Sequence, residues 1–162
     1  MDYDKIEFND EFEDDNEICD VCGCNAMRRV GYNEKEDLLK FECPECEAVI
    51  IEDGMGETTL VKGEMRDWSK YLAENLSLPF DAVALVDSDW KVSLFRRSCP
   101  IRSNDIITVV SICFEDKVFG VVASVMKATK NYTFPLMDLE PIDKESPNAK
   151  LLGNYGNWSG CR

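Results

Sequence analysis

The chain has 162 residues, of which 44% are hydrophobic and 10% aromatic, which is enough apolar material for a core and excludes a wholly disordered protein. Its formal net charge of −14 lies almost entirely in residues 1–63, which carry 19 acidic and 6 basic side chains, whereas residues 64–162 carry 13 and 12. A negative field of this size repels the phosphate backbone of nucleic acids and favours cations or basic proteins as partners.

The N-terminal third contains a tail, a cysteine-rich segment and a connection. Residues 1–18 are predicted to form an acidic, disordered tail whose few apolar side chains could dock on a partner. Short apolar runs then predict three strands, over residues 27–32, 38–41 and 48–51. Two glycines between apolar segments predict a linker over residues 54–63.

The strongest motif is formed by two cysteine pairs. Cys19-x2-Cys22 and Cys43-x2-Cys46 are separated by 20 residues. Two residues between thiols let both sulfur atoms point at one ion, and two such turns complete a tetrahedron with no position left for water. The pattern predicts a structural zinc. The alternative is a redox dithiol, and Cys24 is a fifth thiol that could replace Cys22 as a ligand. Over residues 19–53 the pattern resembles the zinc-ribbon family, whose members are docking or nucleic-acid-binding modules.

The remainder of the chain is predicted to begin with a helix and continue as strands. Apolar residues three to four apart predict a helix over residues 65–76, which Pro79 ends. Alternating apolar runs with close turns follow, over residues 82–86, 91–95, 105–114, 118–125 and 132–136. We therefore expect a mainly β (α+β) protein, in which the zinc ribbon precedes a helix and a small SH3-like β-barrel over residues 64–162.

Carboxylates are the candidate chemistry of this second domain. Calcium needs several oxygen ligands around one ion, and no segment has the spacing of an EF-hand loop. Taken from spacing alone, the acidic residues are ordinary solvated charges. They are Asp81, Asp87, Asp89, Glu115, Asp116, Asp138, Glu140 and Asp143.

Several segments of the second domain resemble one family. They are residues 68–82 (WSKYLAENLSLPFDA), 118–122 (VFGVV), 132–140 (YTFPLMDLE), 146–148 (SPN) and 154–158 (NYGNW). In this order they are similar to the calcium-binding protein CcbP family over about residues 66–162. The resemblance implies calcium binding through Asp81, Asp138, Glu140 and Asp143 at matching positions, with Asp87, Asp89 and Asp116 in acidic loops. Asn154 departs from the family, in which an acidic residue commonly precedes the tyrosine.

Other classes of protein are disfavoured. The sequence has no histidine, which excludes Ser-His-Asp and Cys-His sites, and no phosphate-binding loop, so we expect no enzyme. No run of about 18 apolar residues could cross a membrane, and the acidic N-terminus does not resemble a signal peptide. We therefore expect a cytoplasmic protein, in which paired cysteines bind metal more often than each other.

Three functional hypotheses follow. The first is a non-enzymatic protein with structural zinc and bound calcium, which acts as a sensor, a buffer or a calcium-dependent adaptor. The second is an acidic interaction module that does not bind calcium and docks on a basic protein, as an inhibitor or immunity protein does. The third is a ribbon that contacts nucleic acid, which the net charge of −14 disfavours.

Overall fold

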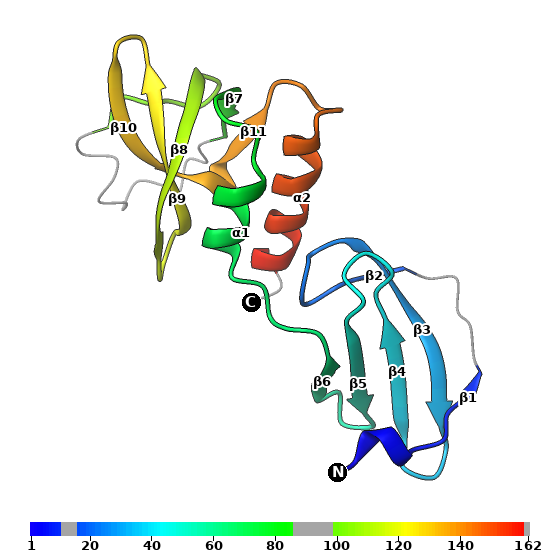
Figure 1. The fold of residues 1–162 in the computed structure, drawn as a ribbon. Coiled ribbons are helices and arrows are strands. Elements are labelled where there is room, and N and C mark those ends of the chain that lie inside the picture. Colours follow the sequence, from blue (N-terminus) through cyan, green and yellow to red (C-terminus); the bar gives the residue numbers. More distant parts are fainter. Residues whose placement is uncertain (11–15, 86–98, 161–162) are drawn as a thin grey trace. The chain divides into compact units, whose positions relative to one another are not determined.

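The computed structural model describes residues 1–10, 16–85 and 99–160. The chain divides into two compact units, the first made of residues 1–66 and 157–162 and the second of residues 67–156. Among the described residues both units are built mainly from β-strands, and the chain adds two α-helices (Figure 1). The expectation of a mainly β protein is therefore confirmed.

The first unit contains a six-stranded antiparallel sheet in which β3 to β6 follow one another in chain order. Its strands are β1 (Asn9–Asp10), β2 (Glu17–Ile18), β3 (Asn25–Asn33), β4 (Leu38–Glu42), β5 (Val49–Asp53) and β6 (Thr58–Lys62). Strands β1 and β2 both pair with β3. The predicted strands in this region correspond to β3, β4 and β5.

Strand β6 occupies residues that the sequence places in a linker. The Asp53 carboxylate accepts hydrogen bonds from the backbone N–H groups of Met55 and Glu57, at 3.0 and 2.9 Å. Gly56 supplies a left-handed φ of +81° in the same turn. Together they reverse the chain, so that Leu60 pairs with Ile50 of β5. The glycines thus belong to a hairpin turn and not to a linker.

The N-terminal segment, expected as a disordered tail, lies against the same sheet. A short 3₁₀ helix, η1 (Tyr3–Lys5), precedes β1. The side-chain amide of Asn33 donates to the Glu7 carbonyl at 2.8 Å. A Cβ at Gly31 would lie 2.8 Å from the Phe8 Cβ, so the missing side chain makes room for Phe8. Backbone pairing and this close approach position residues 7–10.

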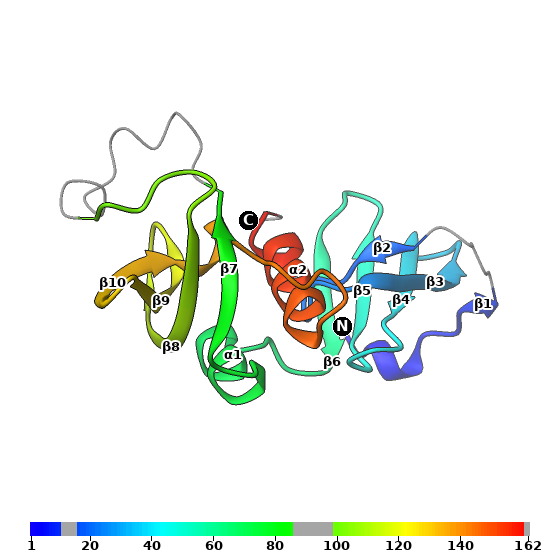
Figure 2. The same ribbon diagram turned by 90° about the horizontal axis from the view of Figure 1, so that it is seen from above.

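The second unit contains a five-stranded antiparallel sheet of order β10-β9-β8-β7-β11. The strands are β7 (Phe80–Ala84), β8 (Ile106–Asp116), β9 (Gly120–Lys127), β10 (Lys130–Pro135) and β11 (Leu139–Pro141). Figure 2 shows β10, β9, β8 and β7 succeeding one another across the sheet. The predicted strand over residues 91–95 lies outside the described residues.

The predicted SH3-like barrel is wrong, because this sheet is open over the part of the chain that the structure describes. Strands β10 and β11 are its edges and do not pair with each other there. β11 is only three residues long, and both edge strands end in proline, which has no backbone N–H to donate. The apolar face is instead buried with two helices, α1 (Trp68–Asn75) and α2 (Pro147–Gly160).

Both helices are fixed to the sheet by specific contacts. Asp67 caps α1 by accepting from the Lys70 N–H at 3.0 Å, which explains why the helix begins later than its apolar spacing predicts. The buried rings of Trp68 and Tyr155 lie 5.3 Å apart, centroid to centroid. The Tyr155 hydroxyl accepts from the Val121 N–H of β9 at 2.8 Å. Aromatic packing and this hydrogen bond join α1, α2 and β9.

A side chain distant in sequence ties α2 to the segment after α1. Asn148 is 5% exposed, and its amide both accepts from the Ser77 N–H and donates to the Ser77 carbonyl, each at 2.9 Å. No helix in the described parts of the chain is long and apolar enough to cross a bilayer.

Candidate metal centre

The structure brings the four predicted zinc ligands together. The sulfur atoms of Cys19, Cys22, Cys43 and Cys46 all lie within 4.8 Å of one another. The Cys19–Cys46 and Cys22–Cys43 sulfur pairs are each 3.7 Å apart. Zinc–sulfur bonds of about 2.3 Å in a tetrahedron require sulfur separations of about 3.8 Å, so the four thiols fit one ion. This soft donor set suits zinc and not calcium.

Two loops with the same backbone geometry hold these thiols. In the first loop the Cys19 N–H donates to the Cys24 carbonyl at 2.9 Å, and the Gly23 N–H donates to the Cys19 carbonyl at 2.8 Å. In the second loop the Cys43 N–H donates to the Ala48 carbonyl at 2.9 Å, and the Glu47 N–H donates to the Cys43 carbonyl at 2.8 Å. Each loop therefore presents its two cysteines in the same way.

The fifth residue of each loop has a left-handed backbone. Gly23 has a φ of +69°, and Glu47 has a φ of +58°. Glycine adopts this conformation freely, whereas glutamate carries a steric penalty in it. The sequence shows the glycine but gives no sign that Glu47 occupies the matching strained position.

The same comparison distinguishes Cys24 from the four ligand candidates. Cys24 corresponds in its loop to Ala48, whose side chain has no atom that could bind a metal. Its sulfur nonetheless lies 3.3 Å from that of Cys22 and 3.4 Å from that of Cys43. The symmetry of the loops favours Cys22 over Cys24 as the metal ligand. In the sequence, aligning Cys-x2-Cys-Gly-Cys with Cys-x2-Cys-Glu-Ala already places Cys24 opposite an alanine and so indicates Cys22 as the ligand.

Burial controls the protonation of the metal-free cluster. It raises the pKa of the Cys46 thiol and that of the Cys24 thiol to about 11. The pKa of Cys19 is also raised, first by its hydrogen bond with the Cys22 side chain and then by burial. These thiols are protonated at neutral pH until a metal displaces their protons, so metal affinity must fall with acid.

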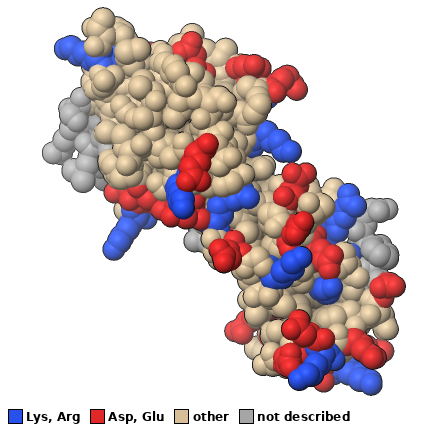
Figure 3. Space-filling model, viewed as in Figure 1, with Lys and Arg blue, Asp and Glu red and all other residues tan. Residues whose placement is uncertain are grey.

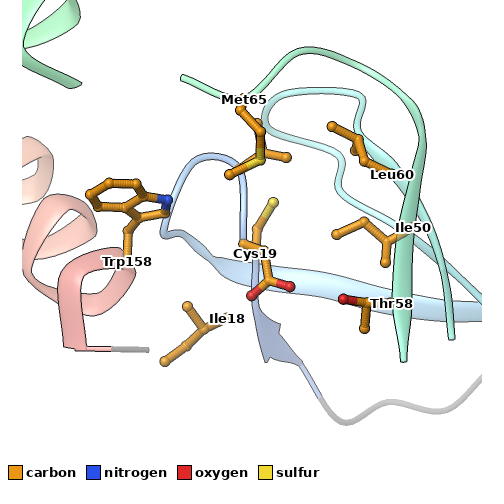
Figure 4. A pocket seen from close by; sticks show the side chains of 9 residues that line it. Ile18, Cys19, Ile50, Thr58, Leu60, Met65 and Trp158 are labelled. Carbon is orange, nitrogen blue, oxygen red and sulfur yellow. The ribbon is translucent and has the colours of Figure 1, made fainter. Parts of the chain in front are cut away.

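A cavity of about 320 Å³ borders the first cysteine loop (Figure 4). The cavity is lined by residues 19–21 of the first loop and by mostly apolar side chains from other segments. The lining residues labelled in the figure are Ile18, Cys19, Ile50, Thr58, Leu60, Met65 and Trp158. Asp20 is its single carboxylate, and a lone acid beside apolar walls provides no paired groups for acid–base chemistry.

The carboxylate candidates lie in the second unit, and four of them follow the edge formed by β7 and β11. Asp81 is on β7, Glu140 is on β11, and Asp138 and Asp143 flank β11 on either side. The Ile142 N–H donates to the Asp81 carbonyl at 3.1 Å, and the Leu85 N–H donates to the Asp138 carbonyl at 2.8 Å. The strand pairing thus places these positions along one edge.

Each of these side chains has its own local surroundings. Asp81 accepts from the Thr108 hydroxyl at 2.7 Å, Asp143 accepts from the Glu145 N–H at 3.1 Å, and Glu140 pairs with Lys144. Among the described residues, no three carboxylates gather within 4.8 Å as the cysteines do. Asp87 and Asp89 lie outside the described residues.

Asp116 is not brought together with the other candidates. Asp81 pairs with Thr108 on β8, and Asp116 lies eight residues further along that strand. At about 3.3 Å per residue this is a separation of more than roughly 20 Å. Its carboxylate accepts from the N–H groups of Val118 and Phe119, at 2.7 and 3.0 Å, and so shapes the β8–β9 turn. Glu115, the preceding residue of β8, is equally remote from β11.

Among the carboxyl groups of the described residues, Asp138 has the environment that perturbs its pKa most. It ends the 3₁₀ helix η4 (Leu136–Asp138) between β10 and β11. Burial raises its pKa to about 6. A carboxyl whose ionised form is poorly solvated gains most from a bound cation, because the cation replaces the lost water. Burial of this kind could not be read from the sequence.

A family model described as calcium binding, that of CcbP, matches residues 49–159, which is more than half of the chain. The chain belongs to the CcbP calcium-binding family. No curated protein matches it. Among solved structures, "The crystal structure of Anabaena CcbP" is similar, with 21% identity and a TM-score of 0.43, over 57% of this chain and 70% of that chain. The family match begins at Val49, so all four cysteines of the cluster lie before the matched region.

Proposed function

We propose that this member of the CcbP family is a non-enzymatic metal-binding protein. It binds calcium through carboxylates of the second unit, and it holds a structural zinc with Cys19, Cys22, Cys43 and Cys46. The calcium proposal is carried by the family match over residues 49–159. The zinc proposal is carried by the four sulfur atoms within 4.8 Å of one another. The protein would act as a calcium sensor, a buffer or a calcium-dependent adaptor.

The proposed calcium ligands lie along the β7–β11 edge. They are Asp81, Asp138, Glu140 and Asp143, the positions at which the sequence resembles the family. Hard oxygen donors of this type suit calcium, and backbone carbonyls and water complete its usual six to eight ligands. The raised pKa of Asp138 supports this placement, because the cation would relieve the cost of ionising a poorly solvated carboxyl. Asp87 and Asp89 stay predictions.

The proposed zinc site would be structural and part of a zinc ribbon over residues 19–53. Four thiolates leave no open position for water or substrate, and the two loops have the same hydrogen-bond pattern. Because the cysteine cluster forms the core of the first unit together with Met27, Phe41 and Ile50, zinc would stabilise that unit as a whole. The absence of an enzymatic reaction and a cytoplasmic location also stay predictions.

Calorimetric titration with calcium tests the proposed function. The zinc-loaded full-length chain is freed of calcium by exhaustive dialysis against calcium-free buffer and then titrated with calcium. Binding heat is expected, and Asp138→Asn should weaken it. Asp116→Asn is the matched control, because Asp116 lies far from the β7–β11 edge and should leave the affinity unchanged. No heat at millimolar calcium would contradict the calcium proposal.

A second candidate is the acidic interaction module, in which the first unit docks on a basic protein. It is supported by the charge of residues 1–63, with 19 acidic and 6 basic side chains. On the face shown in Figure 3, acidic and basic side chains intersperse over the first unit. A pull-down with and without residues 1–18 separates the candidates, since only this one needs the acidic segment. Loss of a basic partner on truncation would favour it.

A further inference from the structure

The cysteine cluster contains one more thiol than a zinc ion can use. Cys24 is 4% exposed, and its sulfur lies 3.4 Å from that of Cys43 in the opposite loop. The Cys24 backbone occupies the position that Ala48 has in the second loop. A zinc ion bound by the four symmetric ligands therefore leaves Cys24 as an uncoordinated thiol in contact with a ligand.

Both thiols are buried, at 4% exposure for Cys24 and 2% for Cys43, and Cys43 is the one that borders a surface groove. It lines a groove of about 550 Å³ on the first unit, together with Pro44. Three cationic side chains, Arg28, Lys40 and Lys62, also line the groove. Two carboxylates line it as well, and they pair with two of these cations: Glu42 with Lys40 at 2.7 Å and Glu47 with Lys62 at 3.7 Å. As a zinc ligand Cys43 would be a thiolate, which is the form of cysteine that attacks peroxides.

We propose that Cys24 and Cys43 form a peroxide-sensitive modification site, in which a disulfide between them removes Cys43 from the metal-binding set. This inference rests on the proposed zinc site. Once Cys43 is bridged, three thiolates are left for zinc, and the ion is released. The first unit would then lose the metal that stabilises it when hydrogen peroxide is present.

The reaction balances with one peroxide molecule. The Cys43 thiolate attacks a peroxide oxygen, the O–O bond breaks, and a sulfenic acid and a hydroxide form, and this hydroxide takes a proton from solvent. The Cys24 sulfur then attacks the Cys43 sulfur, the S–O bond breaks, and the second hydroxide takes the Cys24 proton. Two cysteines are oxidised to a disulfide, and one hydrogen peroxide is reduced to two water molecules.

Cys43 is a better partner for Cys24 than Cys22 is. The Cys24 sulfur is 3.4 Å from that of Cys43 and 3.3 Å from that of Cys22, so the approach to a bond of about 2.05 Å is similar for both pairs and the backbone decides between them. A bridge between Cys22 and Cys24 would span only Gly23, whose left-handed backbone the loop already fixes by a hydrogen bond to Cys19. That bridge would have to distort the loop, whereas a Cys24–Cys43 bridge joins two separate loops.

The test treats the zinc-loaded full-length chain with stoichiometric hydrogen peroxide. Free thiols are alkylated, the protein is digested without reduction, and linked peptides are identified by mass spectrometry. A chromogenic chelator follows zinc release in parallel. The Cys24–Cys43 peptide is expected to accumulate as zinc is released. Before oxidation, Cys24→Ser should bind as much zinc as the unmodified chain does. After peroxide treatment it should give no linked peptide, and it should retain zinc under conditions in which the unmodified chain releases it.

Cys113→Ser is the matched control, because Cys113 is exposed and outside the cluster, and it should behave as the unmodified chain does. A linked Cys22–Cys24 or Cys19–Cys46 peptide, or equally fast zinc release from Cys24→Ser, would overturn the inference. Peptide mapping of the unmodified chain decides the pairing even where the variant folds poorly. A chain that holds no zinc yet forms the bridge would contradict the proposed zinc site, and one that holds zinc without forming the bridge would contradict this inference alone.

Discussion

Replacement of Asp138 by asparagine should stabilise the calcium-free protein at neutral pH and leave its stability unchanged in acid. Burial raises the folded-state pKa of Asp138 from 3.8 to about 6. Below about pH 3 the carboxyl is protonated in both the folded and the unfolded state, so it costs nothing. Between pH 4 and 6 the unfolded state loses the proton first, and the folded state becomes relatively less stable as pH rises.

The size of the effect follows from the pKa difference. A pKa shift of about two units corresponds to a destabilisation of the folded state by about 3 kcal/mol once Asp138 is ionised. Because the site is partly hydrated, we expect a destabilisation of about 1–3 kcal/mol above pH 6. Asparagine keeps the shape of the side chain and cannot ionise, so Asp138→Asn recovers this free energy at pH 7.5. With calcium bound, the unmodified protein should be more stable than Asp138→Asn, because the carboxylate then has a cation to pair with.

Urea unfolding in calcium-free buffer at about pH 3 and about pH 7.5 measures this difference, since the midpoint reports the free energy of unfolding at constant slope. Glu74→Gln is the control, because Glu74 is exposed on α1 and its replacement should change the free energy by less than about 0.5 kcal/mol at either pH. An equal effect of Asp138→Asn at both pH values would refute the argument from burial.

Two backbone predictions test the loops and the helix–sheet contact. Glu47→Gly should stabilise the zinc-loaded protein by up to about 1 kcal/mol in thermal unfolding, because glycine relieves the left-handed strain at φ +58°. Glu45→Gly in the same loop should give no such gain, and destabilisation by both variants would contradict the strain argument. Gly120→Ala should cost about 2–4 kcal/mol, because its Cβ would lie 2.3 Å from the Tyr155 hydroxyl at a φ of +64°. Gly153→Ala on α2 has open space around it and should be neutral or stabilising, so similar melting temperatures for the two alanine variants would contradict the proposed clash.

Features that depend on local spacing could be predicted from the sequence. The cysteine spacing identified four thiols that the structure does bring together, because two residues between cysteines already define the loop. Apolar spacing before Pro79 located α1 to within a few residues. The resemblance to the CcbP family over residues 66–162 is confirmed by the family match over residues 49–159.

Features that depend on contacts between distant residues could not be predicted. Open or closed sheets have the same alternating pattern, so the strand sequences could not show that β10 and β11 are edges. The glycines near residue 55 fit a linker and a hairpin equally well, and only the pairing of Leu60 with Ile50 decides between them. The burial of Asp138 and the contact of Cys24 with Cys43 likewise arise from packing.

Metal content of the purified chain tests the central claim most directly. After dialysis against zinc and calcium and removal of free ions, elemental analysis should find zinc and calcium together. Prolonged dialysis against calcium-free buffer should then remove the calcium and leave the zinc, because oxygen ligands and buried thiolates hold their ions independently. Retention of zinc without any calcium at millimolar calcium would contradict the calcium-binding function. Loss of zinc with the calcium would contradict the closed four-cysteine site.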